Sequence, residues 1–264
     1  MKYGEIRKIN YNYNRTYIRE NGEDMDDWRK YPYTALKSRY YIECSSLLVY
    51  ILWHTRVHPN QITLLYAFGG LVGGALLSVP APVAVVAALI YFVFVKSVLD
   101  WSDGTLARLR DQKTKEGAIL DPWGATVNAV GFFAGYGLYV HNQTDHFVFV
   151  QLTVVVLALM AADVIAFARS NYDGKQLNSA ISSSTDTMDT VSFGRVKKLY
   201  RLAVVLTDAR ARVVDFMCLI VFVEILTHRT LLSPYLFIGA AFGYSLRFAG
   251  GLYVLLKRDY LAKL

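Results

Sequence analysis

Six long apolar runs restrict what this 264-residue chain can fold into. The hydrocarbon core of a bilayer needs about 20 apolar residues in one helix, because backbone polar groups find no water there and must pair within the segment. The run at Val213–Leu226 reaches that length only with the turn that precedes it. The sequence therefore predicts an all-α integral membrane protein, a six-transmembrane-helix bundle. The predicted spans lie near Ile62–Val79, Pro82–Leu99, Ala118–Val140, Phe147–Ala168, Val213–Leu226 and Leu231–Leu256.

Composition favours one membrane domain that follows a cytoplasmic N-terminal segment. Hydrophobic residues make up 54% of the chain and charged residues 19%, which is too apolar for a soluble domain with so many long runs. We predict a cytoplasmic segment at residues 1–58 and a transmembrane domain at residues 59–264. The first 33 residues are polar and aromatic and lack the apolar stretch of a secretory signal peptide. Cys44 and Cys218, far apart in apolar surroundings, are typical of packing residues rather than of a disulfide or zinc site.

An amphipathic stretch at Thr34–Thr55 precedes the first span. Charged side chains punctuate its apolar residues, so we expect an N-terminal amphipathic interfacial helix along the cytoplasmic membrane face. A seventh span beginning at Ser45 is the alternative, although Ser45–Trp53 is too short to cross a bilayer. The tripeptide His58-Pro59-Asn60 breaks this helix, and Asn60 is the predicted N-cap of the next one.

Basic residues orient the predicted bundle. Ten Lys or Arg lie in residues 1–58, four in 101–116, eight in 169–212 and three in 257–264, whereas only Arg229 falls in a loop on the other side. The positive-inside rule therefore places both termini and the loop at 101–116 in the cytoplasm. This placement explains the net charge of +7 without nucleic acid, and it suits anionic lipid head groups.

Glycines recur at intervals of four residues in two predicted spans, which predicts close packing between helices. The same small-residue faces also favour a homodimer, as a weaker expectation. The glycines concerned are Gly69, Gly70, Gly73, Gly74, Gly124, Gly131 and Gly135.

Three carboxylates mark the most informative stretch, residues 100–128. Asp100 and Asp103 are three apart, so they share one face of a helix at the end of the second span. Asp121 stands near the start of the third span, after a basic segment that contains Arg108. Ionisable groups at the edge of a hydrophobic span indicate function. Hard oxygen ligands favour Mg²⁺ or Mn²⁺, and the combination with arginine suggests a site for a divalent metal and phosphate.

These residues resemble the signature D-x-x-D-G-x-x-A-R-x(8)-G-x-x-x-D-x-x-x-D of the CDP-alcohol phosphotransferase (CDP-alcohol phosphatidyltransferase) family. The chain matches seven of the eight fixed positions, and at the last one it has Ala125 in place of the fourth aspartate. The matching residues are Asp100, Asp103, Gly104, Ala107, Arg108, Gly117 and Asp121.

The resemblance implies a membrane transferase for phospholipid or glycoconjugate synthesis. Such an enzyme moves a phosphoryl-alcohol group from a CDP-linked lipid or polyol to an alcohol acceptor and releases CMP. It also implies a two-metal site on Asp100, Asp103 and Asp121, with Asp121 and Arg108 in catalysis. The CDP moiety is assigned to Gly104, Ala107, Arg108 and Gly117, together with Asn60 and Thr63 of a P-N-x-x-T element before the first span. The family is homodimeric, and it uses the position of Ala125 for the base that deprotonates the acceptor.

Ala125 leaves a second class of function open. Alanine at this position also fits a relative that keeps the metal and CDP pocket but acts as a regulatory or scaffold subunit. It fits an engineered variant as well. A transporter also fits six spans but lacks mid-membrane charges in two related repeats.

Other polar residues carry two interpretations each. Arginines in the loop at 169–212 either follow membrane topology or bind a substrate phosphate. Asp163, Asp215 and Glu224 within spans are more typical of structural pairs with arginine than of catalysis.

Topology is directly testable. With Cys44 and Cys218 replaced by serine, single cysteines at Gln112 and Gln143 should be labelled by an impermeant maleimide from opposite sides of the membrane, because the predicted third span separates them. Labelling of both positions from the same side would contradict the predicted topology.

Overall fold

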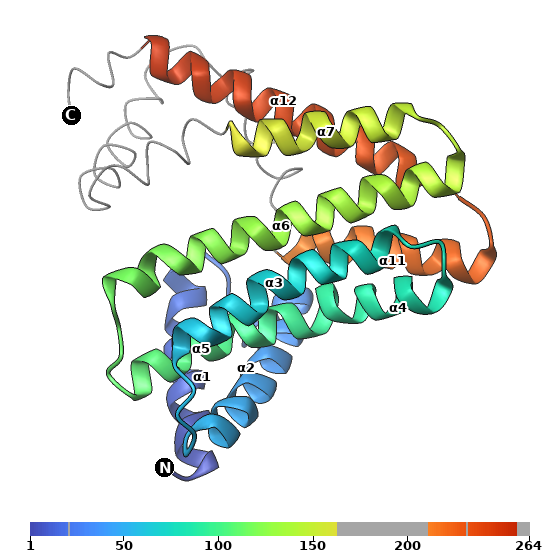
Figure 1. Ribbon diagram of the computed structural model, residues 1–264. Coiled ribbons are helices and arrows are strands. Elements are labelled where there is room, and N and C mark those ends of the chain that lie inside the picture. Colours follow the sequence, from blue (N-terminus) through green and yellow to red (C-terminus); the bar gives the residue numbers. More distant parts are fainter. Residues whose placement is uncertain (21, 163–210, 231, 258–264) are drawn as a thin grey trace. The chain divides into compact units, whose positions relative to one another are not determined.

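All regular elements of the described chain are helices, which confirms the predicted all-α class (Figure 1). The computed structural model describes residues 1–20, 22–162, 211–230 and 232–257. By their contacts the residues form two compact units, Met1–Val72 with Ile90–Ala129 and Gly73–Leu89 with Val130–Leu264. We refer to them as unit 1 and unit 2. The predicted boundary at residue 58 separates a cytoplasmic segment from a transmembrane domain. It is a different division from these two units and stays a prediction.

Each predicted span coincides with a helix, or with part of one. Two of these, Pro59–Ser78 and the continuous helix Pro82–Leu109, are long and apolar enough to cross a bilayer, and Val148–Ala161 is apolar but shorter. The count of six spans stays a prediction, and the fourth predicted span extends beyond residue 162 into residues outside the description. The elements are α3 (Pro59–Ser78), α4 (Pro82–Ile90), η1 (Tyr91–Val95), α5 (Lys96–Leu109), α6 (Lys115–Thr144), α7 (Val148–Ala161), α11 (Ala211–Thr227) and α12 (Ser233–Lys257).

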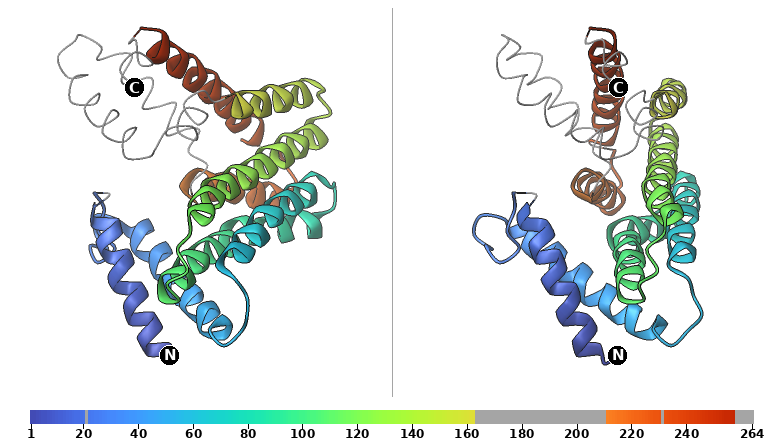
Figure 2. Two further views of the ribbon diagram at one scale, coloured as in Figure 1. Left: turned by 60° about the vertical axis from the view of Figure 1, so that its left-hand side comes forward. Right: turned by 90° about the vertical axis from the view of Figure 1, so that its left-hand side faces the viewer.

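Unit 1 contains a helix that has no counterpart among the predicted elements. α1 (Tyr3–Glu20) packs along α2 (Pro32–Leu52), and α2 packs in turn against α5 (Figure 2). The buried face of α1 has a four-residue spacing, at Ile6, Asn10, Asn14 and Ile18. Two of these four positions are asparagines, so the helix is held by polar contacts as well as by apolar burial.

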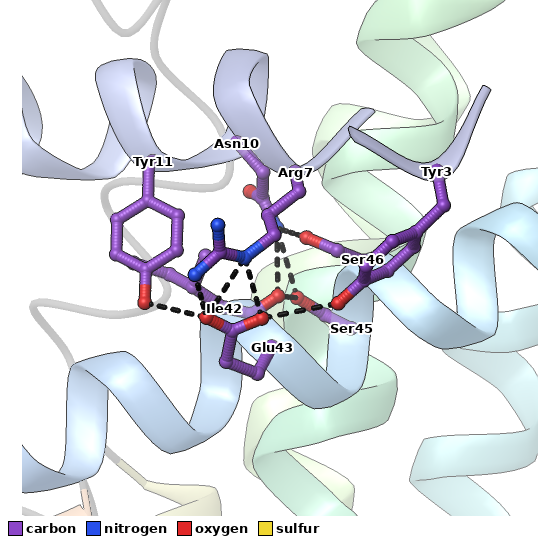
Figure 3. Close-up of polar contacts among 8 residues, drawn as sticks. All are labelled: Tyr3, Arg7, Asn10, Tyr11, Ile42, Glu43, Ser45 and Ser46. Carbon is purple, nitrogen blue, oxygen red and sulfur yellow. Dashed lines mark hydrogen bonds and ion pairs between the residues drawn. The ribbon is translucent and has the colours of Figure 1, made fainter. Parts of the chain in front are cut away.

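Glu43 of α2 is the centre of the polar contacts with α1 (Figure 3). Arg7 donates to both carboxylate oxygens, from Nε at 2.8 and 2.9 Å and from a terminal nitrogen at 2.5 Å. The Tyr3 and Tyr11 hydroxyls donate to the same carboxylate at 3.0 and 2.9 Å. A bidentate arginine pair fixes geometry as well as charge, so this contact sets the register of α1 on α2.

α2 covers most of the predicted amphipathic stretch, and its buried face is mixed in polarity. Ser45 and Ser46 are buried together with Ile42, while Leu36 and Ile51 are exposed. Apolar side chains therefore lie on both the buried and the exposed sides of the helix. The position of α2 along a membrane surface stays a prediction.

The first turn of α3 corrects the predicted N-cap. Helix α3 begins at Pro59, and the side chain of His58 accepts from the backbone N–H of Asn60 at 3.3 Å. Gln61 reciprocates, since its Oε1 accepts from the backbone N–H of His58 at 2.9 Å. His58 is therefore the N-cap, in a capping-box arrangement with proline in the first helical position. The prediction of Asn60 was wrong because histidine, which is outside the preferred capping residues, supplies the acceptor.

A π-helical turn, η1, lies just before the carboxylates of α5. Lys37 of α2 donates to the carbonyl oxygen of Val93 at 2.8 Å and to the Tyr41 hydroxyl at 3.1 Å. Its Nζ also lies 5.5 Å from the centre of the Phe94 ring. A π turn takes more residues than an α turn, so it rotates the helix faces that follow. η1 therefore helps to set the direction in which Asp100 and Asp103 face.

The end of α5 is fixed to the end of α2 by Arg110. Its guanidinium donates to the carbonyls of Leu52, Trp53, Thr55 and Val57 at 2.6–3.0 Å. Arg110 thereby satisfies carbonyls that a helix terminus leaves without partners.

In unit 2, α12 packs against α7 and α11, and Figure 1 shows α7 beside α12. Glu224 of α11 accepts from the backbone N–H groups of Leu232 and Ser233 at 2.9 Å each. This carboxylate therefore caps the start of α12, a structural role. The small-residue faces pack closely as predicted, since a side chain on Gly74 or Gly135 would collide with the backbone of the facing helix.

Glu43 should make the docking of α1 sensitive to acid. The hydrogen bonds from Arg7, followed by those from Tyr11 and Tyr3, lower the pKa of Glu43 from the usual 4.5 to about 2. A folded-state pKa below the unfolded value adds stability above about pH 4.5, and this stability is lost as the pH falls through about 2. Because both side chains are more than a third exposed, solvent reduces the effect. Glu43→Gln should therefore lower the melting temperature at pH 6, and the difference from the unmodified chain should shrink towards pH 2.

Glu20→Gln, the same change on an exposed residue of α1, is the control and should leave melting almost unchanged. A difference for Glu43→Gln that stayed constant from pH 6 to pH 2 would contradict the assignment.

Candidate functional site

The signature residues lie on α5 and α6 within unit 1, and Asp103 is the most enclosed of the three carboxylates. It is buried, and its Oδ2 accepts from the Thr63 hydroxyl of α3 at 2.5 Å. Its Oδ1 accepts from the backbone N–H of Gly104 at 2.5 Å. Hydrogen bonds to a carboxylate stabilise its charged form and fix its orientation. Thr63 thus joins the P-N-x-x-T element directly to the signature.

Arg108 folds back over Gly104 on the same helix. A Cβ on Gly104 would lie 3.2 Å from a terminal nitrogen of Arg108, so the missing side chain leaves room for the guanidinium. A terminal nitrogen of Arg108 donates to the Thr105 hydroxyl at 3.0 Å. The half-buried Ala107 occupies the position before Arg108.

Close contacts between α3 and α6 bring the remaining predicted residues to the same unit. A Cβ on Gly117 would lie 3.1 Å from Asn60 Oδ1, and a Cβ on Gly124 would lie 3.2 Å from Thr63 Cγ2. Asn128 donates to the carbonyl of Tyr66 at 3.0 Å. The structure therefore brings Asn60 and Thr63 beside residues of the signature, and the roles predicted for them stay predictions.

Asp100 and Asp121 differ from Asp103 in having no hydrogen bond to a described residue. Asp100 is half-buried and Asp121 is exposed. Asp121 acts electrostatically on both Asp100 and Asp103, and Lys96 acts on Asp100. Two unbonded carboxylates beside a third are oxygen donors of the kind that Mg²⁺ prefers. As the side chains stand, no three His, Cys, Asp or Glu of the described residues are gathered closely enough to hold a metal ion.

The residues fit a divalent ion in kind, and the carboxylates must turn towards one another to ligate it. The first turns of α6 lack one backbone hydrogen bond beside Asp121, because Pro122 has no N–H to donate to the carbonyl four residues earlier. This missing bond leaves the helix easier to adjust at that point.

Ala125 lies exposed on α6, four residues after Asp121. Positions four apart share a helix face, so a carboxylate at this position would be a neighbour of Asp121. Two further acidic residues lie between Arg108 and Gly117 of the signature. Asp111 follows α5 with a φ of 52°, the left-handed conformation common after a helix C-terminus, and the exposed Glu116 lies in the first turn of α6.

Two residues of α1 contact the signature and are absent from the sequence-based site. The Tyr13 ring lies against the guanidinium of Arg108, with Cζ 3.7 Å from the ring centre. Asn10 accepts from the Thr105 hydroxyl at 3.0 Å. The one local signal was the four-residue spacing of Ile6, Asn10 and Asn14, which shares one helix face but is mostly polar.

An apolar pocket of about 390 Å³ lies in unit 1, where Ile62 and Leu99 directly precede Thr63 and Asp100 in the chain. Its lining residues are Leu48, Leu52, Val57, Gln61, Ile62, Leu65 and Leu99. Six of these seven side chains are apolar, so the pocket suits hydrocarbon.

Some predicted residues lie outside the described part of the chain. These include Asp163 and the basic residues of the loop at 169–212 as far as Arg210.

Comparison with protein families gives one assignment, and comparison with curated proteins gives no match. The model of the CDP-alcohol phosphatidyltransferase family matches residues 56–206, more than half of the chain. The matched range contains the whole signature from Asp100 to Ala125 and the P-N-x-x-T element. The chain therefore belongs to the CDP-alcohol phosphatidyltransferase family, membrane-embedded transferases that move phosphate-containing groups and generally use divalent metal ions.

Proposed function

We propose that this protein moves a phosphatidyl-type group from a CDP-linked lipid to the hydroxyl of an alcohol acceptor and releases CMP. The observation that carries the proposal is the contact between Thr63 and Asp103, which joins two separate family elements in one buried site. We further propose a homodimer in a multi-pass arrangement, with the active site and both termini in the cytoplasm.

Each residue of the proposed site has a role that its chemistry supports. Asp100, Asp103 and Asp121 would hold two Mg²⁺ or Mn²⁺ ions. When bound, such ions neutralise charge on the diphosphate and on the attacking and leaving oxygens. Thr63 and the N–H of Gly104 orient the Asp103 carboxylate, and the fork of Arg108 matches a phosphate. Ala107, Gly117 and Asn60 would border the CDP moiety.

A lipid-linked donor is favoured over a CDP-polyol by the apolar pocket of unit 1. Burying hydrocarbon contributes about 0.8 kcal/mol for each CH₂ group. A polyol offers no such gain, and Gln61 supplies the one polar side chain of the lining. CDP-diacylglycerol should therefore bind more tightly than CDP-glycerol.

Divalent metal should be required for binding of CDP. Binding of CDP to the purified protein should be measurable by calorimetry with MgCl₂ and lost in EDTA. Asp103→Asn keeps the shape of the side chain but removes a charged ligand. Changes around metal ligands cost about 10–100-fold in affinity, so a direct ligand should cost at least about tenfold.

Asp145→Asn makes the same change on an exposed aspartate of the other unit and should leave CDP binding unchanged. CDP binding that persisted in EDTA, or in Asp103→Asn, would show that the three aspartates are not a metal site.

Ala125 should limit turnover rather than binding. A positioned general base is worth about 10²–10⁴ in rate, and alanine has no proton acceptor. Ala125→Asp should therefore raise CMP release from CDP-diacylglycerol, with a panel of alcohol acceptors, by at least about tenfold. Ala125→Asn, which is similar in shape but cannot take the proton, is the matched control.

A regulatory or scaffold subunit is the second candidate, and Ala125 is the observation that favours it. A subunit of this kind would bind CDP in a metal-dependent way, and the unmodified chain would release no CMP. Brisk CMP release by the unmodified chain, with Ala125→Asp neutral, would instead place the base elsewhere.

A further inference from the structure

We propose that helix α1 positions Arg108, with Tyr13 and Asn10 as positioning residues that the family match does not include. The matched range begins at residue 56, whereas α1 ends at Glu20. The inference rests on the proposed function in one respect, since it assumes that Arg108 binds a phosphate of the donor.

Two neighbours confine the guanidinium of Arg108. The absent side chain of Gly104 leaves the space beside a terminal nitrogen. The ring of Tyr13 lies 3.7 Å from Cζ. The ring of Tyr17 is nearly parallel to that of Tyr13, at a centre-to-centre distance of 6.5 Å. An arginine stacked on an aromatic ring keeps the donors at its edge available for phosphate.

A buried polar chain supports the arginine from a second direction. The Thr105 hydroxyl accepts from Arg108, and its single proton is shared between the Trp101 carbonyl at 2.7 Å and Asn10 Oδ1 at 3.0 Å. Asn10 is only 1% exposed. Its Nδ2 donates to the hydroxyls of Ser45 and Ser46 of α2, at 3.0 Å each (Figure 3).

These contacts address a specific difficulty of phosphate binding by arginine. A free arginine side chain loses much rotamer freedom when it is fixed against a ligand. A guanidinium that is already fixed by Gly104, Tyr13 and Thr105 loses less, so the same phosphate contact yields tighter binding. α1 therefore contributes to nucleotide affinity without needing to touch the nucleotide.

The test compares CDP affinity in MgCl₂ for the unmodified chain and five variants, one of them a double variant. Tyr13 is 44% exposed, so its replacement should leave the fold intact. Tyr13→Leu should weaken CDP binding about three- to tenfold, within the range of cation–π contacts, whereas Tyr13→Phe keeps the ring and should bind CDP like the unmodified chain. Arg108→Ala should weaken binding further, and Tyr13→Leu should have no added effect in that background. Tyr50→Leu, on a tyrosine of α2 that is 42% exposed, is the matched control.

The outcomes separate the inference from the proposed function. No binding of CDP by the unmodified chain, or unchanged binding in Arg108→Ala, would overturn the proposed role of Arg108 and the inference together. Weaker CDP binding in Arg108→Ala together with unchanged CDP binding in Tyr13→Leu would overturn the inference alone. An equal loss from Tyr13→Leu with and without Arg108 would also overturn it, since Tyr13 would then act by another route.

Discussion

Buried polar side chains must find their partners within the protein, and this requirement joins α1, α2 and α5 in unit 1. An unpaired polar group in an apolar environment costs roughly 1–3 kcal/mol, so a side chain such as Asn10 stays buried only where partners surround it. Its amide contacts Ser45 and Ser46 on one side and Thr105 on the other. Thr105 belongs to the same helix as Asp103, so the packing of the N-terminal segment and the orientation of the signature depend on the same hydrogen bonds.

The membrane-length helices and the signature were accessible from sequence because both depend on local patterns. Apolar runs of sufficient length have few alternatives to helix, and each predicted span coincides at least in part with a helix. The fixed spacing from Asp100 to Asp121 identified the family, and one of these aspartates, Asp103, contacts Thr63. Close helix packing at Gly74 and Gly135 was likewise visible as a repeat of small residues.

The parts that were missed depend on contacts between distant segments. α1 turns asparagines towards its partner where a helix pattern is expected to show apolar residues, so its periodicity is hidden in a polar sequence. The N-cap of α3 is a histidine, a residue outside the preferred capping set, and Gln61 adds a second capping bond. The contact of Arg108 with Tyr13 joins residues 95 positions apart, and no local pattern announces such a pair.

On the proposed function, affinity for CDP and turnover depend on different side chains. The residues proposed to hold metal and CDP include carboxylates, glycines and an arginine, and two of them, Asp103 and Arg108, are fixed by contacts with α3 and α5. The proton acceptor expected by resemblance belongs to α6, beyond the break in hydrogen bonding at Pro122, where Ala125 is exposed. Loss of one carboxylate there leaves every described contact of Asp103 and Arg108 intact. On this proposal, the chain keeps the residues that bind the nucleotide, while position 125 sets the rate of transfer.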